Sequence, residues 1–136
     1  MHNIPTGTWV VVADGQHARL FHNAGTQDAL RLKQDDLVKL DTADVEGQGP
    51  SGNRPKDQTQ EQTVEATFAK QLVHRLNAAA LTQKFEYLFL VADLKTMGEM
   101  RPQLHPETSK RIVGELNKTL TNSSVEEIEK ILKAQE

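Results

Sequence analysis

The chain has 136 residues, no cysteine, and 16 basic against 19 acidic side chains, which gives a net charge of −3 with histidine neutral. The lack of cysteine excludes disulfides, thiolate nucleophiles and cysteine-ligated zinc or iron–sulfur sites. No apolar run approaches the roughly 18 residues of a membrane span, and the first residues carry no basic and apolar leader pattern. We therefore expect one cytoplasmic domain covering residues 1–136, without membrane contact.

The first part of the sequence predicts three β-strands in succession. Residues 8–13 include an unbroken β-prone run, which is typical of a buried strand. Asp14, Gly15 and Gln16 are a turn signal, so residues 18–22 should return beside the first strand as a hairpin. Residues 29–40 predict a third strand with a polar middle at 33–36, where we expect a bulge or turn. A helix is the competing prediction for this segment.

Residues 41–63 differ in composition from the segments around them. They hold one strongly apolar side chain, Val45, and are otherwise rich in glycine, proline and polar residues. Long segments without regular structure are uncommon in compact domains, and those that occur are usually functional or disordered. We expect a long, polar and flexible loop here.

The second half predicts helices that alternate with strands. Apolar steps of three and four along 61–81 predict an amphipathic helix, and the apolar run within 86–92 predicts a second buried strand. Short helices should follow at 95–101 and 106–111. Residues 112–116 are either a last strand or a continuation of the second of these helices. Two serines then stand three residues before two glutamates, which is capping-box spacing for a final helix: Ser123, Ser124, Glu126 and Glu127.

This order of elements predicts the fold class. Three antiparallel strands followed by βα units predict an α/β fold, in which helices flank a mixed sheet. The arrangement is that of a three-layer domain of the ribonuclease-H-like type.

Several segments together resemble a bacterial family. They read Trp-Val-Val-Val-Ala-Asp at 9–14 with Ala-Arg-Leu-Phe at 18–21, Phe-Ala-Lys-Gln-Leu at 68–72, Leu-Val-Ala at 90–92, Met-Gly-Glu-Met-Arg at 97–101 and Glu-Leu-Asn-Lys-Thr-Leu-Thr at 115–121. The combination resembles the host attachment protein family, which is itself similar to the central domain of archaeal and eukaryotic release factors and of Pelota. The resemblance implies a ribonuclease-H-like fold. The sequence departs from the family at Asp93, where proline is usual, and in a loop that is less basic and less rich in Gly-Arg.

The resemblance implies a candidate site in the long loop. In release factors the corresponding loop carries Gly-Gly-Gln, which enters the ribosomal peptidyl-transferase centre. Glycine lets the backbone approach RNA, and glutamine helps to position water against the peptidyl-tRNA ester. The binding candidates here are Gly47, Gln48, Gly49 and Arg54, with Gln48 as the one catalytic candidate and Glu46 in place of the first glycine. The alternative is a solvated loop in which the Gly-Gln pair is a coincidence.

The best-matching motif, at 97–101, supplies three further candidates. Gly98 would allow close packing of the short helix, and Arg101 would be the anion contact of a ligand groove. Glu99 stands between them, two residues from Arg101, so the two side chains do not face each other on a helix. The alternative is a packing element with surface charges.

The predicted fold also suggests a metal arrangement. Asp14 and Asp93 each follow a buried strand, and neighbouring strands would bring both carboxylates to one edge of the sheet. Two Mg²⁺ ions could be held there, with Glu61 or Glu65 as a third ligand. The alternative is that Asp14 belongs to its turn and Asp93 caps the next helix. We assign no metal and no cofactor.

The sequence predicts an accessory protein that contacts the ribosome or RNA without catalysis. One alternative is hydrolysis of the peptidyl-tRNA ester through Gln48. The other is a protein-interaction module whose loop orders on a protein partner. The oligomeric state stays open.

Overall fold

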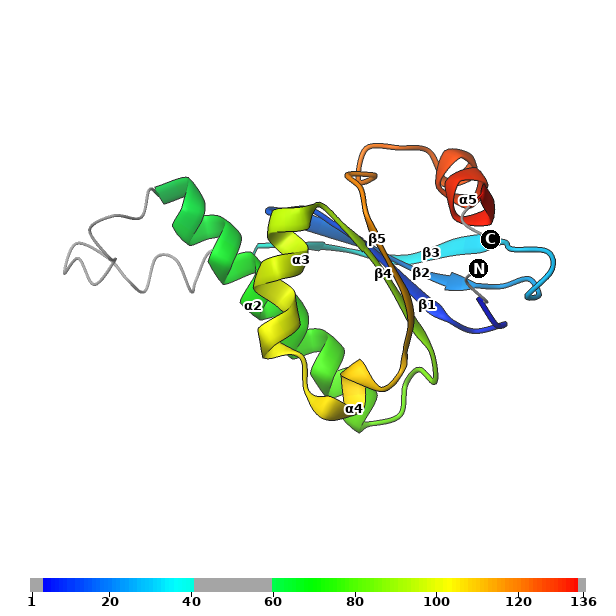
Figure 1. Ribbon diagram of the computed structural model, residues 1–136, viewed down its shortest axis with the longest axis horizontal. Coiled ribbons are helices and arrows are strands. Elements are labelled where there is room, and N and C mark those ends of the chain that lie inside the picture. The colour runs from blue at the N-terminus through cyan, green and yellow to red at the C-terminus, as the bar shows by residue number, and fades with distance from the viewer. Residues whose placement is uncertain (1–3, 41–59, 135–136) are drawn as a thin grey trace.

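The computed structural model describes residues 4–40 and 60–134 (Figure 1). The candidates Gly47, Gln48, Gly49 and Arg54 therefore lie outside the described residues. In the described ranges no helix has the length and apolar character that crossing a membrane requires.

A five-stranded mixed sheet with the strand order β3-β2-β1-β4-β5 forms the middle of the structure. The central strand β1 (Trp9–Ala13) is antiparallel to β2 (His17–Asn23) and parallel to β4 (Leu88–Ala92). The outer strands are β3 (Leu32–Lys39), antiparallel to β2, and β5 (Ile112–Asn117), parallel to β4. The predicted α/β class with a mixed sheet is confirmed. Residues 112–116, for which both a strand and a helix were predicted as alternatives, belong to the strand β5. The ribonuclease-H-like topology stays a prediction.

Helices cover both faces of this sheet, which gives three layers (Figure 1). One face carries α2 (Gln60–Leu81) and α3 (Leu94–Met100), followed by the 3₁₀ helix η1 (Arg101–Gln103) and the short α4 (Pro106–Ser109). The other face carries α5 (Val125–Ala134). Since α2 begins at Gln60, the last residues of the predicted loop are helical.

The two faces of β4 explain its unbroken apolar sequence. Leu90 belongs to the apolar cluster beneath α2 and α3, whereas Phe89 belongs to the cluster beneath α5. Every residue of β4 is at most 1% exposed. A strand that is buried on both faces needs no polar positions, which is why an unbroken apolar run identified it.

The polar middle of the third strand forms the predicted bulge. Leu20 pairs with Asp36 and Phe21 pairs with Gln34, so Asp35 is the extra residue on β3. The Asp35 carboxylate contacts Nδ1 of His22 at 2.7 Å. The helical alternative for this segment is wrong.

The predicted serine cap at the start of α5 is also confirmed, at Ser124. The Oγ of Ser124 accepts a hydrogen bond from the backbone N–H of Glu127 at 3.1 Å, and the Ser124 hydroxyl donates to the Glu127 carboxylate at 3.2 Å. This cap satisfies a backbone donor that the first turn of the helix would otherwise leave unpaired.

Candidate functional site

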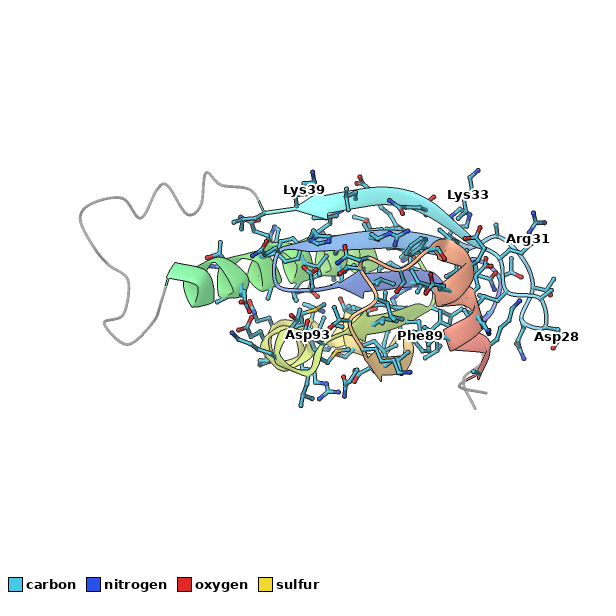
Figure 2. The ribbon with its side chains drawn as sticks, turned by 90° about the horizontal axis from the view of Figure 1, so that it is seen from above. Asp28, Arg31, Lys33, Lys39, Phe89 and Asp93 are labelled. Atoms are coloured by element: carbon cyan, nitrogen blue, oxygen red, sulfur yellow. The ribbon has the colours of Figure 1, made fainter. Side chains whose placement is uncertain are left out.

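The candidate site is the edge of the sheet where β1 and β4 have their carboxyl ends. Open α/β sheets commonly bind ligands in the crevice at this edge. Lys39, near the end of β3, pairs with His17 beside the turn that follows β1. A Cβ atom on Gly15 of that turn would lie 2.6 Å from Cγ of Glu65, so glycine lets α2 pack this closely. Lys39, before segment 41–59, and Glu65, after it, thus both lie near this edge, and Figure 2 shows Lys39 and Asp93 at the same end of the sheet.

Asp14 holds the turn after β1 together. Its Oδ1 accepts hydrogen bonds from the backbone N–H groups of Gln16 and His17 at 2.8 and 2.9 Å. Its Oδ2 accepts a hydrogen bond from the hydroxyl of Thr121 at 2.8 Å. Burial raises the pKa of the Asp14 carboxyl, but these hydrogen bonds and the nearby His17 outweigh it and hold the pKa below its usual 3.8. The turn interpretation of Asp14 is confirmed.

Asp93 is the N-cap of α3. Its side chain accepts a hydrogen bond from the backbone N–H of Thr96 at 3.1 Å, so the cap interpretation is confirmed as well. Both aspartates of the suggested metal arrangement thus bind backbone donors. Within residues 4–40 and 60–134, no three acidic or histidine side chains gather in a way that could hold a metal ion. The side chain of Glu61 lies outside the described part.

Charged side chains from α2 and α3 meet next to this edge. Glu65 of α2 is mostly buried, and its Oε2 lies 3.1 Å from Nζ of Lys95. Oε2 of Glu99 is buried and accepts no hydrogen bond from the described residues. Burial raises the pKa of the Glu99 carboxyl; Lys95 opposes the rise, while the negative charges of Glu65 and Asp93 add to it. Glu99 is therefore the side chain of this group whose negative charge is least well stabilised.

Residues 7–132 match the sequence profile of a family described as bacterial archaeo-eukaryotic release factor family 12. The chain belongs to this family. The match confirms the release-factor relation predicted from the sequence and gives no support to the host attachment name. No curated protein matches the chain.

The raised pKa of Glu99 predicts that the stability of this family 12 domain depends on pH. The unfolded chain has the ordinary glutamate pKa near 4.5, and the folded pKa is higher. The contribution of Glu99 to stability is thus complete below about pH 4.5 and is lost as the pH rises through the folded value. We expect Glu99→Gln to raise the free energy of unfolding at about pH 7 by less than 1 kcal/mol, because solvent screens this partly exposed group.

Urea denaturation of the wild type and Glu99→Gln, at several pH values from about 4 to about 7, checks this expectation. The difference between the two proteins should grow with pH. The same substitution at exposed Glu86 measures the background effect of the change. A wild type that gains stability over Glu99→Gln as the pH rises would contradict the burial of an unsatisfied carboxylate.

The two other candidates of the segment 97–101, Gly98 and Arg101, have the following surroundings. Gly98 is exposed, and a Cβ atom on it would meet nothing within 4 Å, so the predicted close packing is wrong. Arg101 lies on η1 and donates from Nε to Oε1 of Glu115 at 3.2 Å. Its charge is paired across to β5, which makes it a weaker anion contact than a solvated arginine.

Sequence analysis missed Arg19 as an organising residue. Nη1 of Arg19 donates to the carbonyl oxygens of Thr121 and Ser123, and Nε donates to Oε1 of Gln34 at 3.0 Å. The guanidinium also lies 5.0 Å from the centre of the Phe21 ring. Arg19 thereby ties the β5–α5 connection of the family 12 domain to β2. The signal in the sequence is an arginine between the apolar residues Ala18 and Leu20 of a predicted strand.

Proposed function

We propose that this family 12 protein is a cytoplasmic accessory factor of translation that contacts the ribosome or RNA without catalysis. The observation that carries the proposal is the match of residues 7–132 to a release factor family. The position of Lys39 and Glu65, which stand on either side of segment 41–59, near the carboxyl edge of β1 and β4 supports it. By the resemblance to release factors, this segment corresponds to the loop that enters the ribosome.

The loop sequence favours contact over catalysis. Release factors carry Gly-Gly-Gln, whereas this chain has Glu46 before Gly47 and Gln48. An anion at that position would be repelled by the phosphates of ribosomal RNA. The same segment holds more acidic than basic residues, so contact with RNA would depend on its two cations, Arg54 and Lys56.

Sedimentation of the tagged protein with ribosomes from a cell lysate tests the proposal. We expect association at about 50 mM salt that weakens roughly tenfold or more at about 200 mM, because phosphate contacts release bound counterions. Treatment with ribonuclease should move the protein to the soluble fraction. A protein that stays soluble at every salt concentration would refute the proposal.

Two variants separate the proposal from the alternatives. If the protein hydrolyses peptidyl-tRNA through Gln48, purified protein should release labelled peptide from peptidyl-tRNA, and Gln48→Ala should abolish the release. Under our proposal neither protein releases peptide, and Gln48→Ala still sediments with ribosomes. A protein-interaction module predicts a partner that ribonuclease does not displace and that deletion of residues 47–58 removes.

A further inference from the structure

The sheet face that carries α5 is hollowed over β2 and β3. α5 covers only one end of this face, as Figure 2 shows, and the hollow adjoins the other end. Its volume is about 580 Å³, and its lining includes Arg19, Gln34, Leu37, Lys39 and Thr121. Sites for small ligands typically have volumes of about 300–1,000 Å³, so a single nucleotide would fit here.

The charge of this groove is positive. Arg19 and Lys39 line it, and none of the described carboxylates does. Asp14, which binds the Thr121 hydroxyl of the lining, already accepts two backbone hydrogen bonds as well. Its negative charge is therefore largely satisfied by neighbouring donors.

Arg19 is held in place by neutral acceptors alone. Its hydrogen bonds go to two backbone carbonyls and one side-chain amide, whereas Arg75 and Arg101 pair with carboxylates. Nη2 of Arg19 has no acceptor among the described residues. No hydrogen-bonded carboxylate of the described residues compensates the charge of the guanidinium, its orientation is fixed, and one terminal nitrogen is available for a ligand.

An apolar surface lies beside these cations. Leu37 is the cross-strand partner of Arg19, and it is 44% exposed. A ligand with both an anionic group and a flat apolar part could use both features. A nucleotide has this combination, since its phosphate is anionic and its base has an apolar face that also stacks on guanidinium planes.

We propose that this groove binds one nucleotide of single-stranded RNA, with the phosphate at Arg19 and Lys39 and the base or ribose against Leu37. The inference rests on the proposed function in taking RNA as the source of the nucleotide. The lining residues that carry this inference all belong to the described part of the chain.

Two lysines of the same strand provide a matched test. Lys39 lines the groove, whereas Lys33 lies outside its lining and at the opposite end of β3 (Figure 2). Both side chains are exposed, so neither substitution should disturb the fold. Fluorescence anisotropy with a labelled five-nucleotide oligouridylate should show binding that Lys39→Gln weakens about three- to tenfold, with a salt slope lower by about 0.7–1. Lys33→Gln should leave binding within about twofold of the wild type.

Arg19 supplies a second readout that needs no substitution. In a spectrum of the ¹⁵N-labelled protein, the Nε–H signal of Arg19 should shift during titration with the oligonucleotide. No shift at saturating oligonucleotide, or equal binding by Lys39→Gln and the wild type, would overturn the proposal. Competition by polyglutamate as strong as that by unlabelled oligonucleotide would overturn it in favour of an acidic protein segment.

The source of the nucleotide and the proposed function are tested separately. Adenosine monophosphate that competes as well as the oligonucleotide, mole for mole, would assign the groove to a free nucleotide and overturn the RNA source. If the wild type and Lys39→Gln sediment equally with ribosomes and neither binds the oligonucleotide, the groove proposal fails while the proposed function stands. If Lys39→Gln also loses sedimentation, the groove is part of the contact with the ribosome.

Discussion

Replacing Asn23 by alanine is expected to lower the free energy of unfolding by about 3 kcal/mol. Asn23 is fully buried at the end of β2. Its Nδ2 donates to the carbonyl oxygens of Ile4 and Thr26 at 2.9 and 3.1 Å. Its Oδ1 accepts from the backbone N–H groups of Gly25 and Arg31 at 2.9 and 3.1 Å. Alanine would remove this partner from the carbonyl of Ile4 and from the N–H groups of Gly25 and Arg31, whereas the Thr26 carbonyl still accepts from the N–H of Ala29. Each buried group left unpaired costs about 1–3 kcal/mol before the chain relaxes.

Asn23→Asp separates hydrogen bonding from shape. Aspartate has nearly the same volume, but it would place a carboxylate oxygen against the carbonyl oxygens of Ile4 and Thr26. We expect this variant to lose at least as much stability as Asn23→Ala at neutral pH. Asn122→Ala, at an exposed position, is the control and should change stability by less than about 0.5 kcal/mol. Urea denaturation measures all three, and a loss below about 1 kcal/mol for Asn23→Ala would contradict the role of this side chain.

Replacing Phe89 by alanine is expected to lower the free energy of unfolding by about 3–5 kcal/mol. Phe89 is fully buried in β4, between β1 and β5, and belongs to the cluster beneath α5 with Ile128 and Leu132 (Figure 2). Truncation removes the transfer free energy of the ring and leaves a cavity that neighbouring strands cannot close. Since domains are stable by only about 5–15 kcal/mol, the variant should be close to unfolding.

Thermal denaturation checks this expectation. A loss of this size lowers the midpoint of a chain of this length by roughly 10 °C or more. Phe89→Leu should lose less than half as much, because most of the apolar volume stays. Leu94→Ala removes a large side chain that is 68% exposed, and we expect it to change the midpoint only slightly. Equal shifts for Phe89→Ala and Leu94→Ala would contradict the assignment of Phe89 to the core.

Sequence analysis correctly predicted the elements whose formation depends on residue patterns only a few positions long. Burial on both faces produces the unbroken apolar run of β4. The cap between Ser124 and Glu127 spans three residues and determines where α5 begins. The bulge at Asp35 follows from a polar stretch inside a strand pattern.

The candidate site was less predictable, because its contacts join distant parts of the chain. The motif drew attention to Glu99, but its pKa is raised chiefly by burial, and the charges that add to the rise come from Glu65 on α2 and Asp93 after β4. The same motif suggested close packing at Gly98, which instead faces open space. A local pattern contains no information about what another element places beside it.

The sequence by itself determined the order and type of the elements and the class of the fold, since hydrophobic periodicity and capping act over a few residues. Only the tertiary structure decided the strand order and the surroundings of the charged groups. Thr121 binds Asp14 across 107 positions and Arg19 across 102 positions. These two hydrogen bonds hold Thr121 in the lining of the groove over β2 and β3. Such hydrogen bonds form because the sheet and α5 bring the β5–α5 connection back over β2, so they exist only once the layers have packed.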